Sequence, residues 1–340
     1  MSESEGAVIS ELGALARAQN VQAEGERAPN ARDAVRALRP SQIREVANAG
    51  FGVPDVLPFW FGESDQVTPL WPNLVEIPKI LGASVETVAL TYGVTGWTLD
   101  IDRLLDALTP GTRMLMINSP NNPTGWVMTR EQQQAVLDRC RQLGIWLVAD
   151  EVYERLYYGD DAALAPSFLD LATRDERVIA VNSFSKAWLM TGWRLGWIVA
   201  PERLMEDLGK LVEYNTSCAP SFVQMAGIAA VKDGEQFTRS LVADLRASRD
   251  YLVTALQQIP GIDVRAPAGS MYLFFRLPGA NRSLELCKAL VRESALGLAP
   301  GSAFGPEGEG FVRWCYACDT ARLDAGVARL RAFMQAHPAG

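Results

Sequence analysis

The sequence contains few of the residues that build several common kinds of site. It has a single histidine and five cysteines, and none of its apolar runs approaches the roughly 20 residues needed to cross a bilayer. The histidine, His337, lies close to the end of the sequence, so we expect proton transfer to depend on lysine, tyrosine or carboxyl groups. The first residues lack the basic and apolar segments of a secretory signal, which predicts a cytoplasmic protein.

The cysteines give little support for a disulfide framework or a metal site. Their number is odd and most are far apart in the sequence. Cys315 and Cys318 form a C-x-x-C pair, but without a second pair or a nearby histidine this is half of a zinc site. We therefore expect reduced thiols in a core strand and no metal.

Charge excludes another class of partner. Lysine and arginine number 32 against 40 aspartate and glutamate residues, giving a net charge of −8. The basic residues are scattered rather than clustered, so neither a nucleic acid nor a membrane surface is an expected partner.

The centre of the sequence alternates between strand and helix patterns. Thr129 and Gln132 have the spacing of a capping box, and Gly144 follows the helical pattern that they begin. Three apolar runs predict buried strands: 113–118, 145–149 and 178–182. This alternation predicts an α/β fold with a mostly parallel sheet and helices on both faces.

The remaining segments suggest a division into domains. Residues 1–61 are predicted to form an N-terminal arm and a lead-in segment. Residues 62–245 are predicted to form the large domain. Residues 246–340 read as helix, strand, helix, strand and helix, which predicts a smaller α+β domain.

Ligands of parallel sheets bind beyond the carboxyl ends of the strands, so the three turns that follow the predicted strands are expected to meet. These turns, 119–125, 150–153 and 183–194, carry an amide, a carboxylate, a phenol, an amine and a guanidinium. That set suits a cofactor that is anionic at one end, has a ring nitrogen to be kept protonated, and reacts through an aldehyde.

Each residue also has a plain alternative role. Asp150 could cap a following helix, Asn122 could belong to an ordinary Asn-Pro-Thr-Gly turn, and Lys186 could be a solvated surface lysine. Their occurrence together on successive strand ends favours a common site.

Four segments resemble the class I/II aminotransferase family: Ser119–Gly125, Val148–Tyr153, Ser183–Lys186 and Gly192–Gly196. Their order and spacing match, and the resemblance extends from about residue 41 to residue 336. It implies the fold-type I architecture of pyridoxal 5′-phosphate (PLP) enzymes, and transfer of an amino group between an α-amino acid and a 2-oxo acid. It also implies a homodimer.

The resemblance assigns roles residue by residue. Lys186 would form a Schiff base with PLP and move the α-proton of the substrate. Asp150 would pair with the pyridine nitrogen. Tyr153 and Asn122 would hydrogen-bond the phenolic oxygen and tune the pKa of the imine.

Further residues would hold the phosphate, the ring and the substrate. Ser183 and Arg194 correspond to the phosphate ligands, and Trp71 to the aromatic residue that stacks on the ring. Arg313 and the backbone of Gly62, together with Asn122, would bind the substrate carboxylate. Taken alone, Trp71 would more often be a core aromatic and Arg313 a surface strand residue.

One departure from the family lies before Trp71. The family places several dozen residues between the segment at Gly62 and this tryptophan, whereas here the two flanks nearly meet. We therefore expect a missing strand and helix, apolar sheet surface left uncovered, and part of the phosphate site absent, with PLP affinity lower by a factor of about 100 or more.

Other activities remain open at this point. A PLP-dependent β-lyase or decarboxylase would use the same Lys186 and Asp150, and a non-catalytic remnant with weakened cofactor binding would fit the deletion. Aromatic residues indicate either an apolar substrate pocket or a packed domain interface: Phe59, Trp60, Tyr214 and Tyr272.

Overall fold

The computed structural model describes residues 41–50, 52–59, 72–159 and 162–337. Contacts group Arg39–Ile77 with Glu86–Gly340 in one compact unit and place Pro78–Val85 in another. Three residues lie outside the described part of the chain: Gly62, predicted to bind the substrate carboxylate, Trp71, predicted to stack on the cofactor ring, and Trp60.

The described elements follow one another as helices, short 3-10 turns and strands. The α-helices are α3 (Gln42–Ala49), α4 (Pro72–Ile80), α5 (Ile101–Ala107), α6 (Arg130–Leu143), α7 (Glu202–Asn215), α8 (Ser221–Asp233), α9 (Glu235–Gln257), α10 (Ser283–Ser294) and α11 (Thr320–Ala336). The 3-10 turns are η1 (Phe168–Asp170), η2 (Thr191–Trp193), η3 (Ala280–Arg282), η4 (Gly301–Phe304) and η5 (Pro306–Gly308). The strands are β1 (Leu57–Pro58), β2 (Thr91–Gly93), β3 (Gly96–Thr98), β4 (Met114–Asn118), β5 (Trp146–Asp150), β6 (Val178–Ser183), β7 (Gly196–Val199), β8 (Tyr272–Arg276), β9 (Leu296–Gly297), β10 (Ala299–Pro300) and β11 (Phe311–Cys315).

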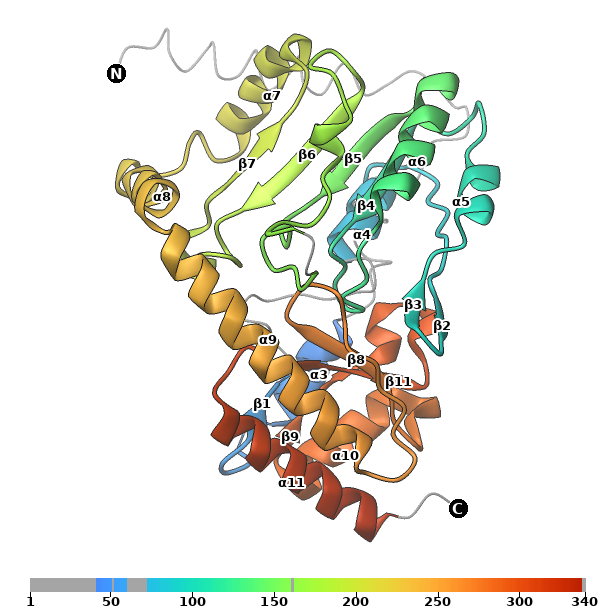
Figure 1. Ribbon diagram of the computed structural model, residues 1–340, viewed down its shortest axis with the longest axis vertical. Coiled ribbons are helices and arrows are strands. Elements are labelled where there is room, and N and C mark those ends of the chain that lie inside the picture. Colours follow the sequence, from blue (N-terminus) through green and yellow to red (C-terminus); the bar gives the residue numbers. More distant parts are fainter. Residues whose placement is uncertain (1–40, 51, 60–71, 160–161, 338–340) are drawn as a thin grey trace, which may run out of the picture. The chain divides into compact units, whose positions relative to one another are not determined.

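A four-stranded sheet with the order β4-β5-β6-β7 carries the three predicted strands side by side (Figure 1). β4, β5 and β6 are parallel, and β7 joins the edge antiparallel to β6. The expected mostly parallel sheet is therefore confirmed. Because β4, β5 and β6 run the same way, their carboxyl ends share one edge of the sheet.

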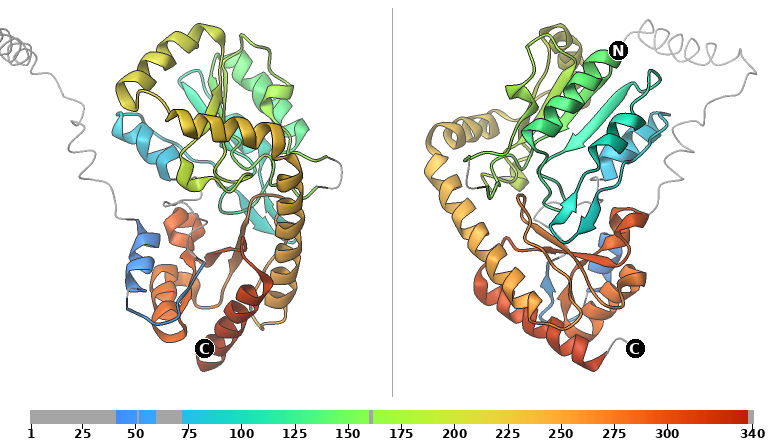
Figure 2. Two further views of the ribbon diagram at one scale, coloured as in Figure 1. Left: turned by 90° about the vertical axis from the view of Figure 1, so that its left-hand side faces the viewer. Right: turned by 45° about the vertical axis from the view of Figure 1, so that its right-hand side comes forward.

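Helix α6 lies along one face of this sheet, as two views show (Figures 1 and 2). The predicted capping box is present: the Thr129 side chain accepts from the backbone of Gln132, and the Gln132 side chain accepts from the backbone of Thr129. Gly144 ends the helix in the left-handed conformation, at φ 68°. Buried side chains of α6, including Val136 and Leu137, pack into a core with apolar residues of β4 and β5.

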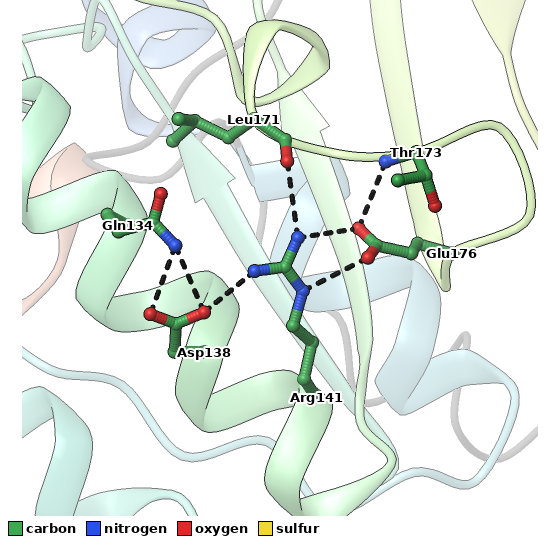
Figure 3. A network of polar contacts seen from close by, with 6 residues as sticks. All are labelled: Gln134, Asp138, Arg141, Leu171, Thr173 and Glu176. Atoms are coloured by element: carbon green, nitrogen blue, oxygen red, sulfur yellow. Dashed lines mark hydrogen bonds and ion pairs between the residues drawn. The ribbon is translucent and has the colours of Figure 1, made fainter.

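Polar contacts tie the outer side of α6 to the segment that leads into β6 (Figure 3). The Arg141 guanidinium donates through Nε and Nη2 to the two carboxylate oxygens of Glu176, at 3.1 and 3.0 Å. Its Nη2 also donates to the Leu171 carbonyl at 3.2 Å, and its Nη1 pairs with Asp138 at 2.7 Å. This bidentate geometry fixes the orientation of the helix on the sheet more than it adds stability.

A second core surrounds the three-stranded antiparallel sheet β10-β11-β8. Buried apolar residues of α9, α10 and α11 pack there with β8 and β11. The predicted order of helix, strand, helix, strand and helix is present, and the domain boundary at residue 246 stays a prediction. β1 pairs with β9, and α3 packs on α10, so the lead-in segment contributes to the same core. Phe59 packs against Trp314 with ring centroids 4.8 Å apart and ring planes tilted by 37°, so it contributes to this core.

The far edge of the four-stranded sheet exposes apolar side chains, as expected for a sheet that lacks cover. β7 and the helices α7 and α8 contribute them: Ile198, Val199, Met205, Leu211, Val212, Phe222, Met225, Ile228 and Val231. Helix α7 has no buried residue. The deletion that would account for this exposure remains a prediction, because residues 60–71 lie outside the described part of the chain.

The search for membrane spans, restricted to the described residues, finds no helix with the length and apolar character to cross a bilayer.

Candidate active site

The carboxyl edge of the four-stranded sheet brings the predicted turns together. Asn118 at the end of β4 pairs with Asp150 at the end of β5, and β6 ends beside them at Ser183. The Asn118 side-chain amide donates to the Asp150 carbonyl at 3.2 Å, and its oxygen accepts from the backbone N–H of Asn122 at 2.9 Å. The first turn is thus anchored directly to the strand that carries Asp150.

Lys186 is 6% exposed, so the alternative of a solvated surface lysine is wrong. Its Nζ lies 5.8 Å from the centroid of the Tyr153 ring, and its charge interacts with the Asp150 carboxylate. Burying an amine has a free-energy cost that an interior location rarely repays without a role or partners. Lysine, carboxylate and phenol therefore form one cluster, as the sequence predicts.

The Asp150 carboxyl is held in a site that withdraws it from water. Burial raises its pKa from 3.8 to about 6, while a hydrogen bond from the Val152 N–H and the charge of Lys186 oppose the rise. The Val152 N–H lies 3.3 Å from Asp150 Oδ1, and the segment after β5 is a turn, so Asp150 caps no helix. At pH 7 this group is a desolvated carboxylate, which suits pairing with a cationic ring nitrogen.

Arg313 and Asn122 meet close to the Tyr153 member of this cluster. Arg313 is 2% exposed in β11 and Asn122 is 3% exposed, so Arg313 is not a surface strand residue. The Arg313 Nη1 donates to Asn122 Oδ1 at 2.8 Å. The charge of Arg313 also acts on the Tyr153 hydroxyl. The planar guanidinium has a donor geometry that matches a carboxylate.

Ser183 and Arg194 are both hydrogen-bonded to Ser185. Ser183 Oγ accepts from the Ser185 N–H at 3.0 Å and donates to the Leu195 carbonyl at 3.4 Å. Arg194 is exposed, adopts a left-handed backbone at φ 52°, and points Nη1 toward Ser185 Oγ at 3.5 Å. Two hydroxyls and a guanidinium make a donor set that suits a phosphate.

Three contributors to this region were missed by the sequence analysis or left ambiguous. Tyr272 lies beside Tyr153 and Arg313, Phe304 also contacts Arg313, and Glu151 is buried next to Asp150. The Tyr272 position has no local signal because its role depends on contacts between distant strands. Tyr214, by contrast, is 89% exposed and contributes nothing to a pocket in this chain.

The donor set fits PLP. A buried lysine can bind the aldehyde, a desolvated carboxylate can pair with the ring nitrogen, a phenol and an amide can reach the phenolic oxygen, and Ser183 with Arg194 can hold the phosphate. Among the described residues, no group of three or more histidine, cysteine, aspartate or glutamate side chains could hold a metal ion.

Comparison with known proteins gives the family. The model of the family described as aminotransferase class I and II matches residues 57–330. An aspartate aminotransferase from Musicola paradisiaca is 32% identical over 74% of this chain, which spans 62% of that relative's length. An aromatic-amino-acid aminotransferase from Thermococcus litoralis is 34% identical over 74% of this chain, and the match spans 65% of that relative's length. An aromatic aminotransferase structure from Pyrococcus horikoshii has a TM-score of 0.74 at 26% identity, covering 91% of this chain and 92% of the other. The chain belongs to the class I and II aminotransferase family, whose cofactor is PLP, and has the fold-type I architecture.

Proposed function

We propose that this protein uses PLP to transfer an amino group between an α-amino acid and a 2-oxo acid. The observation that carries the proposal is the burial of Lys186 beside Asp150 and Tyr153, with Arg313 close to the same phenol. When bound, PLP supplies an aldehyde and an electron-withdrawing ring. The chain spans less than two thirds of the length of the Musicola paradisiaca and Thermococcus litoralis relatives. The proposed activity therefore depends on this geometry as well as on family membership.

Arg313 binds the substrate α-carboxylate in this proposal. Its planar guanidinium matches a carboxylate in a bidentate arrangement, which a lysine would not reproduce. The 2.8 Å hydrogen bond to Asn122 restrains rotation of the guanidinium before substrate arrives. With the carboxylate held, the Cα–H bond of the substrate has a defined direction, and orientation of this kind contributes strongly to rate.

Lys186 holds and moves the proton of that Cα–H bond. A buried amine has little water to compete for its proton, and the site around it is lined by buried Tyr153 and Asn122. Asp150 keeps a negative charge beside the ring nitrogen at pH values above its pKa of about 6. A charged carboxylate in this place suits pairing with a cationic ring nitrogen.

The remaining contacts complete the proposed site. Ser183 and Arg194 would bind the phosphate, and Tyr153 with Asn122 would hydrogen-bond the phenolic oxygen. Trp71 would stack on the ring and Gly62 would approach the substrate carboxylate. A homodimer in the cytoplasm is the proposed assembly and location.

The test is the visible absorbance of purified protein with and without added PLP. We expect the wild type to gain a visible band, Lys186→Ala to lack it, and Lys210→Ala to keep it because Lys210 is an exposed residue of α7. A wild-type protein that gains no band would refute the proposal and favour a non-catalytic remnant.

The same loaded protein separates the chemical alternatives. L-Aspartate or L-phenylalanine should bleach the band, and 2-oxoglutarate should restore it, if amino groups are transferred. Ammonia or carbon dioxide released without any oxo acid would instead identify a β-lyase or a decarboxylase. Neither substrate is implied by the contacts of the described residues, so both are tested.

A further inference from the structure

Tyr272 occupies a position that connects two parts of the site. It begins β8, is 2% exposed, and pairs with Cys315 of β11, while Arg313 pairs with Phe274. Directly opposed residues of an antiparallel pair point to the same face, so Tyr272 and Arg313 are diagonal neighbours on one face. The register of the small sheet therefore sets the tyrosine ring against the guanidinium.

The ring of Tyr272 forms a platform for Arg313. The guanidinium carbon lies 4.2 Å from the Tyr272 ring centroid and 4.9 Å from that of Phe304. Contact at this distance in a buried site attracts the cation to the ring by the ring's quadrupole. Together with the hydrogen bond to Asn122, this contact defines the plane of the guanidinium.

The hydroxyl of Tyr272 faces a different group. It lies 3.3 Å from the Tyr153 hydroxyl, and the two rings stand nearly perpendicular, at 76°. Burial, and after it the neighbouring Tyr272, raises the pKa of Tyr153 well above its ordinary value, so Tyr153 stays protonated. A protonated Tyr153 can accept a hydrogen bond from Tyr272 and still donate its own proton elsewhere.

We propose that Tyr272 is a positioning residue whose ring orients Arg313 for the substrate carboxylate and whose hydroxyl strengthens the hydrogen bond that Tyr153 donates to the cofactor. This inference rests on the proposed function, because it takes Arg313 and Tyr153 to face substrate and cofactor. It adds a link between these two residues, because the Tyr272 side chain restrains both the Arg313 guanidinium and the Tyr153 phenol. The two roles belong to different atoms and can be tested separately.

The ring is tested by carboxylate binding to the PLP-loaded protein. The probe is 3-phenylpropanoate, with 3-phenylpropanamide as the matched ligand that lacks the charge, and affinities are measured by calorimetry. Tyr272→Leu should weaken binding of the acid by about 3- to 30-fold, which corresponds to the loss of a buried cation–π contact. Tyr272→Phe, which keeps the ring, should bind the acid within about twofold of wild type, and neither variant should change binding of the amide by more than that.

Three results would overturn this role. Acid binding to Tyr272→Leu that equals wild type shows that the ring does not orient Arg313. An equal loss for acid and amide shows a general collapse of the pocket and not a lost platform. If Tyr272→Leu fails to fold, an acid affinity of Tyr272→Phe reduced beyond twofold overturns the role, and an unchanged affinity supports it.

The hydroxyl is tested by the pH dependence of the visible absorbance. With PLP bound, a hydrogen bond donated by Tyr153 would stabilise negative charge on the phenolic oxygen, so a stronger bond would lower the pH midpoint of the absorbance change. Tyr272→Phe should therefore raise the midpoint by about 0.2–0.5 pH units, in line with cooperative strengthening in a hydrogen-bond chain. Tyr153→Phe should raise it further, and the double variant should match Tyr153→Phe alone.

The control is Tyr251→Phe, since Tyr251 is a helix α9 residue whose hydroxyl donates to Asp324 at 2.8 Å. Its midpoint should equal that of wild type. A Tyr272→Phe midpoint equal to wild type, or a shift that persists in full in the Tyr153→Phe background, overturns the proposed hydroxyl role. If wild type binds PLP and the Tyr272 variants behave like wild type, only this inference is refuted. If wild type gains no visible band, the proposed function is refuted.

Discussion

Glu151 is a buried carboxyl whose ionisation should make the stability of this protein depend on pH. It is 2% exposed, with Oε2 accepting from Ser167 Oγ at 2.7 Å and Oε1 from the Phe168 N–H at 3.0 Å. Burial raises its pKa from 4.5 to about 7, against the effect of these two hydrogen bonds. Glu151→Gln keeps a carbonyl acceptor and an amide that can donate to the serine hydroxyl, while removing the charge.

The magnitude and sign follow from linkage between protonation and folding. A pKa of about 7 in the folded protein against 4.5 in the unfolded chain corresponds to about 3 kcal/mol. The folded state holds the proton more tightly, so this stability is fully present below pH 4.5 and is lost as the pH rises through about 7. Wild type should therefore lose stability relative to Glu151→Gln across that window.

The assay is urea denaturation of the cofactor-free proteins at pH 5 and pH 8. The free energy of unfolding of Glu151→Gln minus that of wild type should increase by about 2–3 kcal/mol between these values. Glu86→Gln is the control, because the Glu86 side chain is exposed and its difference from wild type should stay constant. A change below about 0.5 kcal/mol for Glu151→Gln would show that the carboxyl is not desolvated in the folded protein.

Two further substitutions test the backbone and the helix that support the site. In Gly125→Ala the new Cβ would lie 2.3 Å from Pro267 Cβ and 2.6 Å from the Gly269 carbonyl oxygen, so we expect a loss of about 3 kcal/mol in urea denaturation. A loss under about 1 kcal/mol would contradict that packing. Thr129→Ala should cost about 1 kcal/mol by removing the cap of α6, and Thr129→Ser should restore most of it. Equal stability of the alanine and serine variants would argue against the cap.

Local patterns in the sequence were sufficient to predict much of the fold. Some features depend only on neighbours within one turn or one strand, so they can be predicted without the rest of the chain. These are the capping box at Thr129, the helix end at Gly144 and the apolar runs of β4, β5 and β6. The antiparallel edge strand β7 was not predicted, because its short GWIV segment is flanked by the active-site motif and carries no periodicity of its own.

Part of the candidate site was predicted from the family motifs and from the chemistry of the residues that follow each strand. Lys186, Asp150 and Arg313 were identified from their motifs, and the structure confirms that all three belong to one region. The placement of Gly62 and Trp71 stays a prediction, since both lie outside the described residues.

The sequence by itself determined which chemical groups this protein has, in what order, and on which strand ends they lie, because these follow from residue type and local spacing. The tertiary structure decided how far those groups are removed from water and which distant partners they meet. The pKa of Glu151 is raised to about 7 only because the folded chain buries its carboxyl, and Tyr272 contacts both Arg313 and Tyr153 only because β8 pairs with β11 in one register. Desolvation and contacts between distant strands depend on the packing of the whole chain, and no short stretch of sequence specifies them.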